Sequence, residues 1–211
     1  MTKRSQKIGW IVWTVLAVTA LAILLAFIRE RTRAGGKNST YPVLFAVRPF
    51  ALTNQLGHII GTTNLLGHVW VADIVFTSCA GPCPRMTTLM SELHKSVPPA
   101  EPVRFVTLTT DPEHDTPAVL ERYGRQHSAD PARWLFLTGS KSQIKDAAVA
   151  GLKFTALEKE PSQQESDSDL FIHSTIFVVV DKRGNARAVF ETDQAGVKEN
   201  ILTAIRALLD E

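Results

Sequence analysis

Apolar residues form one long run close to the start of the chain. Residues 8–28 contain no charged side chain. A helix rises about 1.5 Å per residue, so this run spans a bilayer core of roughly 30 Å. Trp10 and Trp13 lie near its first end, where amphipathic rings favour the membrane interface. The pattern predicts a retained transmembrane helix. A cleaved signal peptide is the alternative, but its apolar region is typically shorter and ends at small residues.

After this run, segments typical of strands alternate with segments typical of helices. Runs rich in β-branched residues indicate strands, and apolar residues three and four positions apart indicate helices. The predicted strands are 50–55 and 57–61, which form a hairpin, then 66–76, 103–108, 133–137, 174–181 and 186–190. The predicted helices are 84–96, 117–127, 141–150 and 196–209. The strand at 66–76 is apolar enough to be buried on both faces.

The order of these elements predicts an α/β fold. Strands alternate with helices first, and a hairpin followed by a helix comes last, so helices would cover both faces of a central sheet. This order matches a thioredoxin-like core preceded by one transmembrane helix. The predicted division is a cytoplasmic N-terminus at 1–7, the transmembrane helix at 8–28, a linker at 29–43 and the thioredoxin-like domain at 44–211.

The distribution of charge excludes one class of partner. The chain has 23 Lys and Arg against 21 Asp and Glu, but three of the basic residues precede the apolar run. From Arg29 onward, the chain has 20 basic and 21 acidic side chains. This part therefore lacks the basic patch that nucleic-acid binding needs. Basic residues flank both ends of the run and do not fix its orientation. Residues 158–169 carry five acidic groups and predict a solvated loop.

The two cysteines of the chain are the main candidates for chemistry. Cys79 and Cys83 lie four positions apart, between the strand at 66–76 and the helix at 84–96. Positions i and i+4 of one helical turn face the same way, so we expect the two sulfurs to lie together. They can form a stabilising disulfide, exchange disulfides as a redox pair, or share one soft metal ion. A helix N-terminus favours the thiolate, which serves both redox chemistry and metal binding.

A histidine far along the chain favours the metal alternative. His173 directly precedes the strand at 174–181. In a thioredoxin-like core the loop entering this strand lies against the start of the first helix, so His173 would face the cysteines. Two thiolates and one imidazole suit Cu(I), whereas a structural zinc site normally has four ligands and the chain has no third cysteine. Taken alone, a histidine at a strand end more often makes one hydrogen bond than binds a metal.

Three motifs, in this order, resemble the Sco/SenC family. They are FTSCAGPCP at residues 76–84, DPEHDTP at 111–117 and IHSTIFVVVD at 172–181. The resemblance covers residues from about 45 to 211. It implies a membrane-anchored, thioredoxin-like copper chaperone for the assembly of cytochrome c oxidase.

The resemblance also implies a ligand set and a partner. The copper ligands of the family are the two cysteines of its first motif and the histidine before the late strand, which correspond to Cys79, Cys83 and His173. Family members deliver copper to the dinuclear centre of oxidase subunit II. Some members also act as thiol–disulfide reductases on the cysteines of that subunit.

The chain departs from the family pattern at two places near these ligands. The family often has an acidic residue between the cysteines, where this chain has Ala80, Gly81 and Pro82. It often has Asp before the ligand histidine, where this chain has Ile172. Both changes remove negative charge, so we expect them to alter copper affinity, thiol acidity or partner docking.

Other side chains that can bind metals or protons are assigned structural roles. Met86 could offer a fourth soft ligand, but its helical spacing favours core packing. The residues expected in the core are Met86, Trp70 and Trp134. Those expected at the surface are His58, His68, His94 and His114, with His94 on a solvated helix face. Those expected to serve as turn and cap groups are Asp111 and Asp115, with Asp115 or Thr116 as the N-cap of the next helix.

The sequence therefore predicts a single-pass protein of a bacterial inner membrane, whose soluble domain faces the periplasm or the outside. The leading hypothesis is a copper chaperone rather than an enzyme. It holds Cu(I), with Cu(II) as the alternative state, on Cys79, Cys83 and His173. Its expected partner is cytochrome c oxidase subunit II or a related copper-accepting protein, and it binds no nucleic acid. The alternatives are a membrane-tethered thiol–disulfide reductase with a redox-active Cys79–Cys83 disulfide, and a copper or redox sensor.

Overall fold

The computed structural model describes residues 13, 16, 18–23, 40–154, 156–158, 170–172 and 174–211. The chain divides into two compact units, Met1–Ser39 and Thr40–Glu211. In the first unit the described residues are helical. None of the helices in the described parts of the chain is long and apolar enough to cross a bilayer. Most of the predicted span at 8–28 and of the predicted linker at 29–43 lies outside the described residues.

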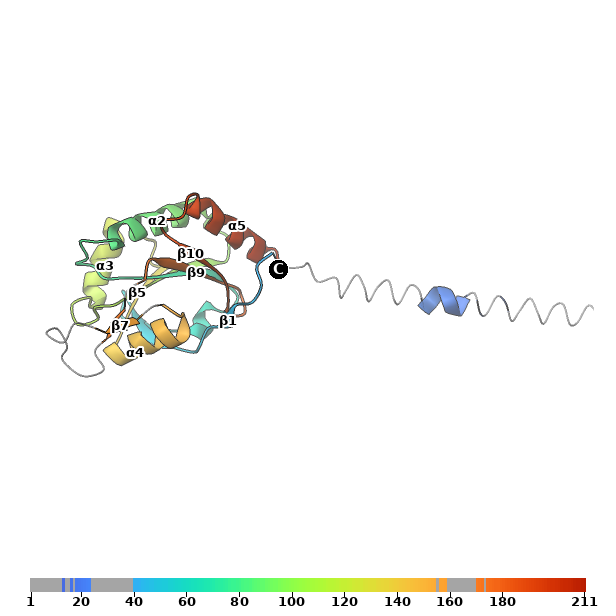
Figure 1. Cartoon of the computed structure of the whole chain (residues 1–211), viewed down its shortest axis with the longest axis horizontal. Coiled ribbons are helices and arrows are strands. Elements are labelled where there is room, and N and C mark those ends of the chain that lie inside the picture. The colour runs from blue at the N-terminus through green and yellow to red at the C-terminus, as the bar shows by residue number, and fades with distance from the viewer. Residues whose placement is uncertain are drawn as a thin grey trace, which may run out of the picture. The chain divides into compact units, whose positions relative to one another are not determined.

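A mixed sheet of eight strands forms the centre of the second unit (Figure 1). Its strands are β1 (Phe45–Ala46), β2 (Ala51–Asn54), β3 (Ile59–Gly61), β4 (Val69–Val75), β5 (Val103–Thr109), β6 (Trp134–Thr138), β9 (Ile176–Val180) and β10 (Asn185–Glu191). Their order across the sheet is β1-β10-β9-β4-β5-β6-β2-β3. Neighbours β4, β5 and β6 are parallel, and the remaining pairs are antiparallel. A second, two-stranded sheet pairs β7 (Ala156–Glu158) with β8 (Leu170–Ile172).

Helices pack on both faces of the large sheet. The helices are α2 (Cys83–Ser96), α3 (Pro117–Gln126), α4 (Lys141–Lys145) and α5 (Val197–Leu209), with the 3-10 helix η1 (Thr62–Leu65) and the π-helix η2 (Asp146–Gly151). Apolar side chains of α2, α3 and α5 form one core cluster with one face of the sheet, and those of α4, η1 and η2 form a second cluster with the other. Figure 1 shows α2 and α5 on one side of the strands and α4 on the opposite side.

Strand β4 separates the two clusters and leads to the cysteines. Its seven residues are all buried, as the apolar run in the sequence predicts. Side chains alternate between the faces of a strand. Val71 and Val75 therefore pack in the cluster with α2, whereas Trp70 and Ile74 pack in the cluster with α4.

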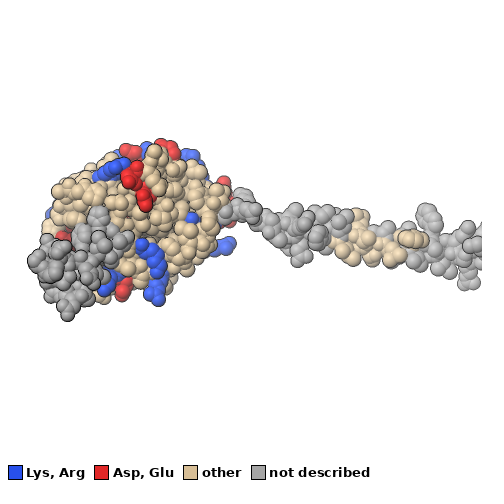
Figure 2. Space-filling view, in the orientation of Figure 1, with Lys and Arg blue, Asp and Glu red and all other residues tan. Residues whose placement is uncertain are grey.

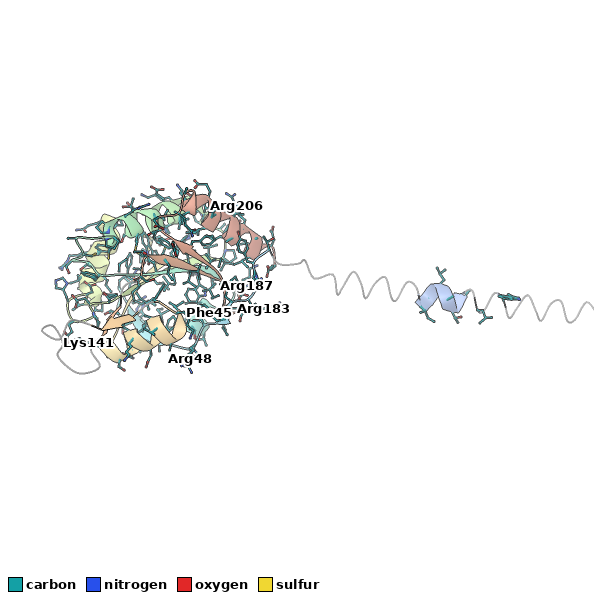
Figure 3. The ribbon with its side chains drawn as sticks, in the orientation of Figure 1. Phe45, Arg48, Lys141, Arg183, Arg187 and Arg206 are labelled. Atoms are coloured by element: carbon teal, nitrogen blue, oxygen red, sulfur yellow. The ribbon has the colours of Figure 1, made fainter. Side chains whose placement is uncertain are left out.

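The structure confirms the predicted α/β fold with helices on both faces and corrects several elements. The predicted hairpin is present as β2 and β3, which extend the sheet beyond β6. The helix predicted at 141–150 is α-helical only to Lys145 and continues as a π-helix. Strand β1 was not predicted; its Phe45 pairs with Ala186 and lies near Arg187 (Figure 3). Two residues are too short a run to show alternation in a sequence.

Charged side chains of both signs share the surface of the second unit. On the face drawn in Figure 2, basic and acidic side chains are interspersed among uncharged ones. This mixture agrees with the nearly balanced charge of the chain after residue 28. The predicted acidic loop at 158–169 lies outside the described residues, apart from Glu158 at the end of β7.

Candidate metal centre

The two cysteines lie between the end of β4 and the start of α2. Only Cys83 belongs to the helix, as its first residue, and Cys79 lies in the preceding loop. The prediction that one helical turn aligns both sulfurs is therefore wrong. The helix begins only after its N-cap residue Pro82, so Cys79 lies outside its first turn. Pro84 occupies the first turn of α2, as predicted.

Hydrogen bonds within the loop bring the two sulfurs together. The Gly81 N–H donates to the Cys79 sulfur at 3.4 Å. Cys83 lies close enough to Cys79 for its thiol and its N–H to lower the pKa of the Cys79 thiol. Both cysteines are free thiols in this structure. The loop thus provides the alignment that was predicted for a helical turn.

The two thiols differ in acidity. Burial raises the pKa of Cys83 to about 12, and its hydrogen bond with Cys79 adds to the rise. Partial burial alone would raise the pKa of Cys79, but the hydrogen bonds from Cys83 and Gly81 outweigh it and lower that pKa. Cys79 therefore ionises first and is the better nucleophile, whereas Cys83 is held as a protonated thiol.

A buried carboxylate ties the Cys79 loop to the loop after β5. Asp115 is fully buried and accepts a hydrogen bond from the Thr77 N–H at 3.1 Å. It also accepts hydrogen bonds from the hydroxyls of Thr77 and Thr109. Of the two residues predicted as N-cap, Asp115 and Thr116, the structure places Thr116 at that position, with Pro117 as the first residue of α3. Asp115 therefore does more than the predicted turn or cap, because it fixes the backbone two residues before Cys79.

His173 lies outside the described residues, but its neighbours on both sides are described. Thr175 accepts a hydrogen bond through its carbonyl from the Thr192 N–H at 2.9 Å. The Thr192 carbonyl in turn accepts a hydrogen bond from the Arg85 guanidinium at 3.0 Å. Arg85 is in the first turn of α2, two residues after Cys83. The chain that follows His173 is therefore linked to the same end of α2 that carries the thiol pair.

The donor atoms at this place favour a soft metal ion. In the described parts of the chain, no three side chains of His, Cys, Asp or Glu lie close enough together to hold a metal ion. The described donors are thus the two sulfurs of Cys79 and Cys83. Thiolates prefer soft ions such as Cu(I), so a third ligand from an adjoining segment would complete a site of the predicted kind.

Most of the other predicted placements are confirmed. Met86, Trp70 and Trp134 are buried in the core. His58 and His114 are exposed, and His68 is half-buried with its Nδ1 3.2 Å from the Leu66 carbonyl oxygen. Asp111 accepts a hydrogen bond from the His114 N–H at 3.4 Å, which is the predicted turn role.

The prediction of a solvated His94 is wrong. The residue is 7 % exposed, and neither ring nitrogen has a hydrogen-bond partner in the described structure. Its ring centroid lies 5.4 Å from that of Phe105 and 5.8 Å from that of Trp134. Position 94 follows Met90 by one helical turn, so it continues the buried stripe of α2. Burial, and then the charge of Arg133, lower the pKa of His94 and favour the neutral ring.

Asp73 was not among the residues predicted to be functional. This residue lies in β4, is fully buried, and has no hydrogen-bond partner for either carboxyl oxygen in the described structure. A signal was present in the sequence, because an acidic residue stands inside a run predicted to be buried on both faces. An ionisable group in such a place is usually paired or functional.

The comparison with known protein families identifies the family of this chain. The SCO1/SenC family profile matches residues 41–210. The chain belongs to the SCO1/SenC family. It is 34 % identical over 152 residues to the SCO1 protein homolog of Bacillus subtilis (strain 168), covering 71 % of this chain and 76 % of that protein. The predicted resemblance is therefore confirmed.

Solved structures show the same thioredoxin-like Sco fold. A SCO1/SenC family lipoprotein from Bacillus anthracis str. Ames aligns with a TM-score of 0.66 and 29 % identity, covering 78 % of this chain and 95 % of that one. BsSco, a Sco family member with an identified disulfide switch, aligns with a TM-score of 0.62 and 26 % identity, covering 81 % and 97 %. Copper-bound ScoI of Bradyrhizobium japonicum has a TM-score of 0.57 at 24 % identity, covers 77 % and 99 %, and supports the fold alone.

Proposed function

We propose that this SCO1/SenC protein is a copper chaperone. It binds Cu(I) as cargo through Cys79, Cys83 and His173 and delivers it to the dinuclear copper centre of cytochrome c oxidase subunit II. The observation that carries the proposal is the pair of free thiols of Cys79 and Cys83, close enough to shift each other's pKa, at the start of α2 in a SCO1/SenC chain. BsSco is described as a cytochrome c oxidase assembly protein, which supports the choice of partner.

The thiols differ in a way that suits reversible binding. Both must lose their protons to bind the metal as thiolates, so uptake of Cu(I) releases protons. The lowered pKa of Cys79 makes it the first sulfur to engage the ion, and the raised pKa of Cys83 makes its attachment the more costly one. An incoming ligand of the acceptor would therefore displace Cys83 first, and the ion would leave by stepwise ligand exchange.

The described residues next to His173 support its proposed role as the third ligand. Hydrogen bonds from Arg85 to Thr192 and from Thr192 to Thr175 join the first turn of α2 to the chain two residues after His173. Strands β4 and β9 are antiparallel, so the start of β9 lies beside the end of β4 that leads to Cys79. Both contacts favour a position of His173 close to the sulfurs.

Membrane anchoring is part of the same proposal. The uncharged run at 8–28 is long enough to span a bilayer and would tether the second unit outside the cytoplasm. One relative of the same fold is described as a lipoprotein, which supports membrane association. A tether would keep the copper donor at the surface where a membrane-bound oxidase is assembled.

A transfer assay tests delivery. The full-length chain in detergent, loaded with Cu(I), is mixed with the metal-free soluble domain of subunit II under reducing conditions and then oxidised. We expect the visible absorption of the dinuclear copper centre to appear, and to be absent when the chain carries Cys79→Ser and Cys83→Ser. Equal transfer by free Cu(I) and by the loaded chain would contradict a delivery role.

A second function, thiol–disulfide reduction, is favoured by one specific observation. Cys79 is half-buried with a lowered pKa, and Cys83 is buried with a raised pKa, which are the properties of an attacking and a resolving thiol. This chemistry does not require His173. We expect His173→Ala to retain disulfide reductase activity and to lose tight copper binding, whereas His58→Ala at an exposed position changes neither.

A further inference from the structure

Two consecutive hydrogen bonds join helix α3 to the residue that begins α2. The Thr87 hydroxyl donates to the Cys83 carbonyl oxygen at 3.0 Å. The Tyr123 hydroxyl of α3 lies 2.8 Å from the Thr87 hydroxyl. A hydroxyl has one proton to donate, and Thr87 donates its own to Cys83. Tyr123 is therefore the donor in the second bond, so the two bonds run in one direction from Tyr123 to Cys83.

The two bonds lie in the packed layer between the helices and the sheet. Thr87 is 1 % exposed. Tyr123 is half-buried, and its ring centroid lies 6.0 Å from that of Phe136 and 4.7 Å from that of His127. Burial raises the pKa of Tyr123 to about 12, so the hydroxyl keeps the proton that it donates. Hydrogen bonds in such surroundings are electrostatically stronger than in water.

The first turn of α2 lacks the usual devices that hold a helix end. Its N-cap residue is Pro82, whose side chain has no hydrogen-bonding group, and the first turn contains no acidic residue. Helix ends fray when their backbone groups have few partners. Tyr123 and Thr87 fix the Cys83 backbone from the side of α3. They thereby limit the movement of the residue that carries the buried thiol.

The same part of the chain also fixes the loop of the other cysteine. Asp115, two residues before α3, accepts the Thr77 N–H at 3.1 Å, and Thr77 lies two residues before Cys79. Tyr123 follows within α3 and is linked to Cys83. The loop after β5 and helix α3 therefore support both halves of the thiol pair.

We propose that Tyr123 is a positioning residue for Cu(I) binding, which acts through Thr87 to hold Cys83 in a fixed place beside Cys79. This inference rests on the copper-binding function proposed above. Two sulfurs bind one ion tightly when both are already in place, because mobile ligands lose conformational freedom on binding. Groups that orient a metal ligand in this way typically contribute about ten- to hundredfold to affinity.

A second hydrogen bond between the same two elements provides a matched control. The Ser91 hydroxyl of α2 donates to the carbonyl oxygen of His127, the C-cap residue of α3, at 2.9 Å. Ser91 follows Cys83 by about 12 Å along the helix axis. Tyr123→Phe and Ser91→Ala therefore each remove one hydrogen bond near the junction of α2 and α3. Only the bond of Tyr123 continues to the cysteine.

Copper affinity is the first measurement. The reduced full-length chain in detergent is titrated with Cu(I) against the coloured Cu(I) chelator bicinchoninate. We expect Tyr123→Phe, which keeps the ring but loses the donor, to weaken Cu(I) affinity at least about tenfold. Ser91→Ala should change the affinity by less than about twofold, because distant sites seldom couple.

Substitutions of Thr87 test the path between Tyr123 and Cys83. Thr87→Ser keeps the hydroxyl, so we expect Cu(I) affinity within about twofold of the wild type. Thr87→Val keeps the shape but loses the hydroxyl, so it should weaken binding as much as Tyr123→Phe does. The double variant Thr87→Val, Tyr123→Phe should bind no more weakly than Thr87→Val alone, because both changes break the same connection.

The metal-free chain provides a readout that is independent of copper. Cys83 is 6 % exposed, so iodoacetamide reaches its thiol when the first turn of α2 opens. We expect Tyr123→Phe to speed the labelling of Cys83 at least about threefold, and Ser91→Ala to leave the rate within about twofold. Peptide mass spectrometry measures the label.

Each outcome decides a defined point. Wild-type Cu(I) affinity in Tyr123→Phe, equal weakening in Ser91→Ala, or unchanged labelling of Cys83 overturns the proposal and leaves the copper function standing. Absence of Cu(I) binding by the wild type overturns the copper function and this inference with it. If Tyr123→Phe does not fold, Thr87→Val is compared with Thr87→Ser, and equal Cu(I) affinities of these two variants overturn the proposal.

Discussion

Asp115 accepts a hydrogen bond from the backbone N–H of Thr77 at 3.1 Å and so joins two loops at one edge of the sheet. Parallel strands β4 and β5 end at this edge, and the loop after each carries one of the two residues. The hydroxyls of Thr77 and Thr109 donate to the same carboxylate. Charge-assisted hydrogen bonds of this kind hold the approach to Cys79 in one conformation.

The first prediction concerns Asp115. Asp115→Asn replaces one acceptor oxygen by an N–H₂ group that faces donors, so we expect the free energy of unfolding to fall by about 2–3 kcal/mol. Urea denaturation measures the change. Asp111→Asn in the same loop is the control and should cost less than about 1 kcal/mol. Equal losses in both variants would show that Asp115 has no special role in holding the Cys79 loop.

The second prediction concerns the acidity of the two thiols. Because burial raises the pKa of Cys83 to about 12 and hydrogen bonds lower that of Cys79, alkylation at pH 7 should label Cys79 first. Brief treatment of the reduced chain with iodoacetamide, followed by peptide mass spectrometry, measures the order. We expect at least about tenfold more label on Cys79, since the thiolate is the reactive form. Preferential labelling of Cys83 would contradict the assigned roles.

The sequence predicted much of the fold because its patterns have a direct geometric meaning. Continuous apolar runs predicted β4 and β9, and apolar residues at helical spacing predicted α2 and α5. The errors arise where contacts distant in sequence decide the structure. His94 is buried because α2 lies against Phe105 and Trp134, whereas its polar ring alone suggested a solvated face.

The candidate site was predictable in composition but not in geometry. The spacing of Cys79 and Cys83 indicated that they meet, yet the loop with Gly81 and Pro82 brings them together instead of a helical turn. The role of Asp115 depends on which strands are neighbours, and a single sequence without pairing information does not contain that order. His173 stays a prediction, because it lies outside the described residues.

The third prediction concerns a buried ion cluster near the start of β10. Arg187, labelled in Figure 3, is 6 % exposed. Its guanidinium lies 2.8 Å from Asp181 and 2.9 Å from Glu211, and it also donates to the Tyr41 carbonyl. Arg187→Met leaves the Asp181 carboxylate buried without its cation. We expect a loss of about 3–5 kcal/mol in the free energy of unfolding. Arg183→Met, at an exposed position nearby, should change it by less than about 0.5 kcal/mol.

The stabilisation that Arg187→Met removes depends on pH. Burial would raise the pKa of Asp181, but hydrogen bonds from Asn185, Arg187 and Arg183 lower it below its ordinary value. The unfolded chain therefore binds a proton at Asp181 more readily than the folded chain. The stabilisation is present above about pH 4 and is lost as the pH falls further. The difference between the wild type and Arg187→Met should shrink in acid, and a constant difference would exclude the ion pair as its cause.

The fourth prediction concerns His94. Burial lowers its pKa, so the unfolded chain takes up a proton at a higher pH than the folded chain does. Stability is therefore complete above about pH 6.5 and falls as the pH drops below that value. We expect His94→Phe to keep the aromatic packing, to stabilise the chain at pH 5.5 by about 1–2 kcal/mol and to flatten the acid limb of the stability curve. His58→Phe, at an exposed position, should leave the fall of stability in acid unchanged.

Copper affinity tests the central claim most directly. The reduced full-length chain is titrated with Cu(I) against bicinchoninate, a coloured Cu(I) chelator that competes for the ion. The account predicts one tightly bound Cu(I) per chain, which the double variant Cys79→Ser, Cys83→Ser loses, His173→Ala weakens at least about tenfold and His58→Ala retains. Binding by the double serine variant that equals the wild type would contradict the account.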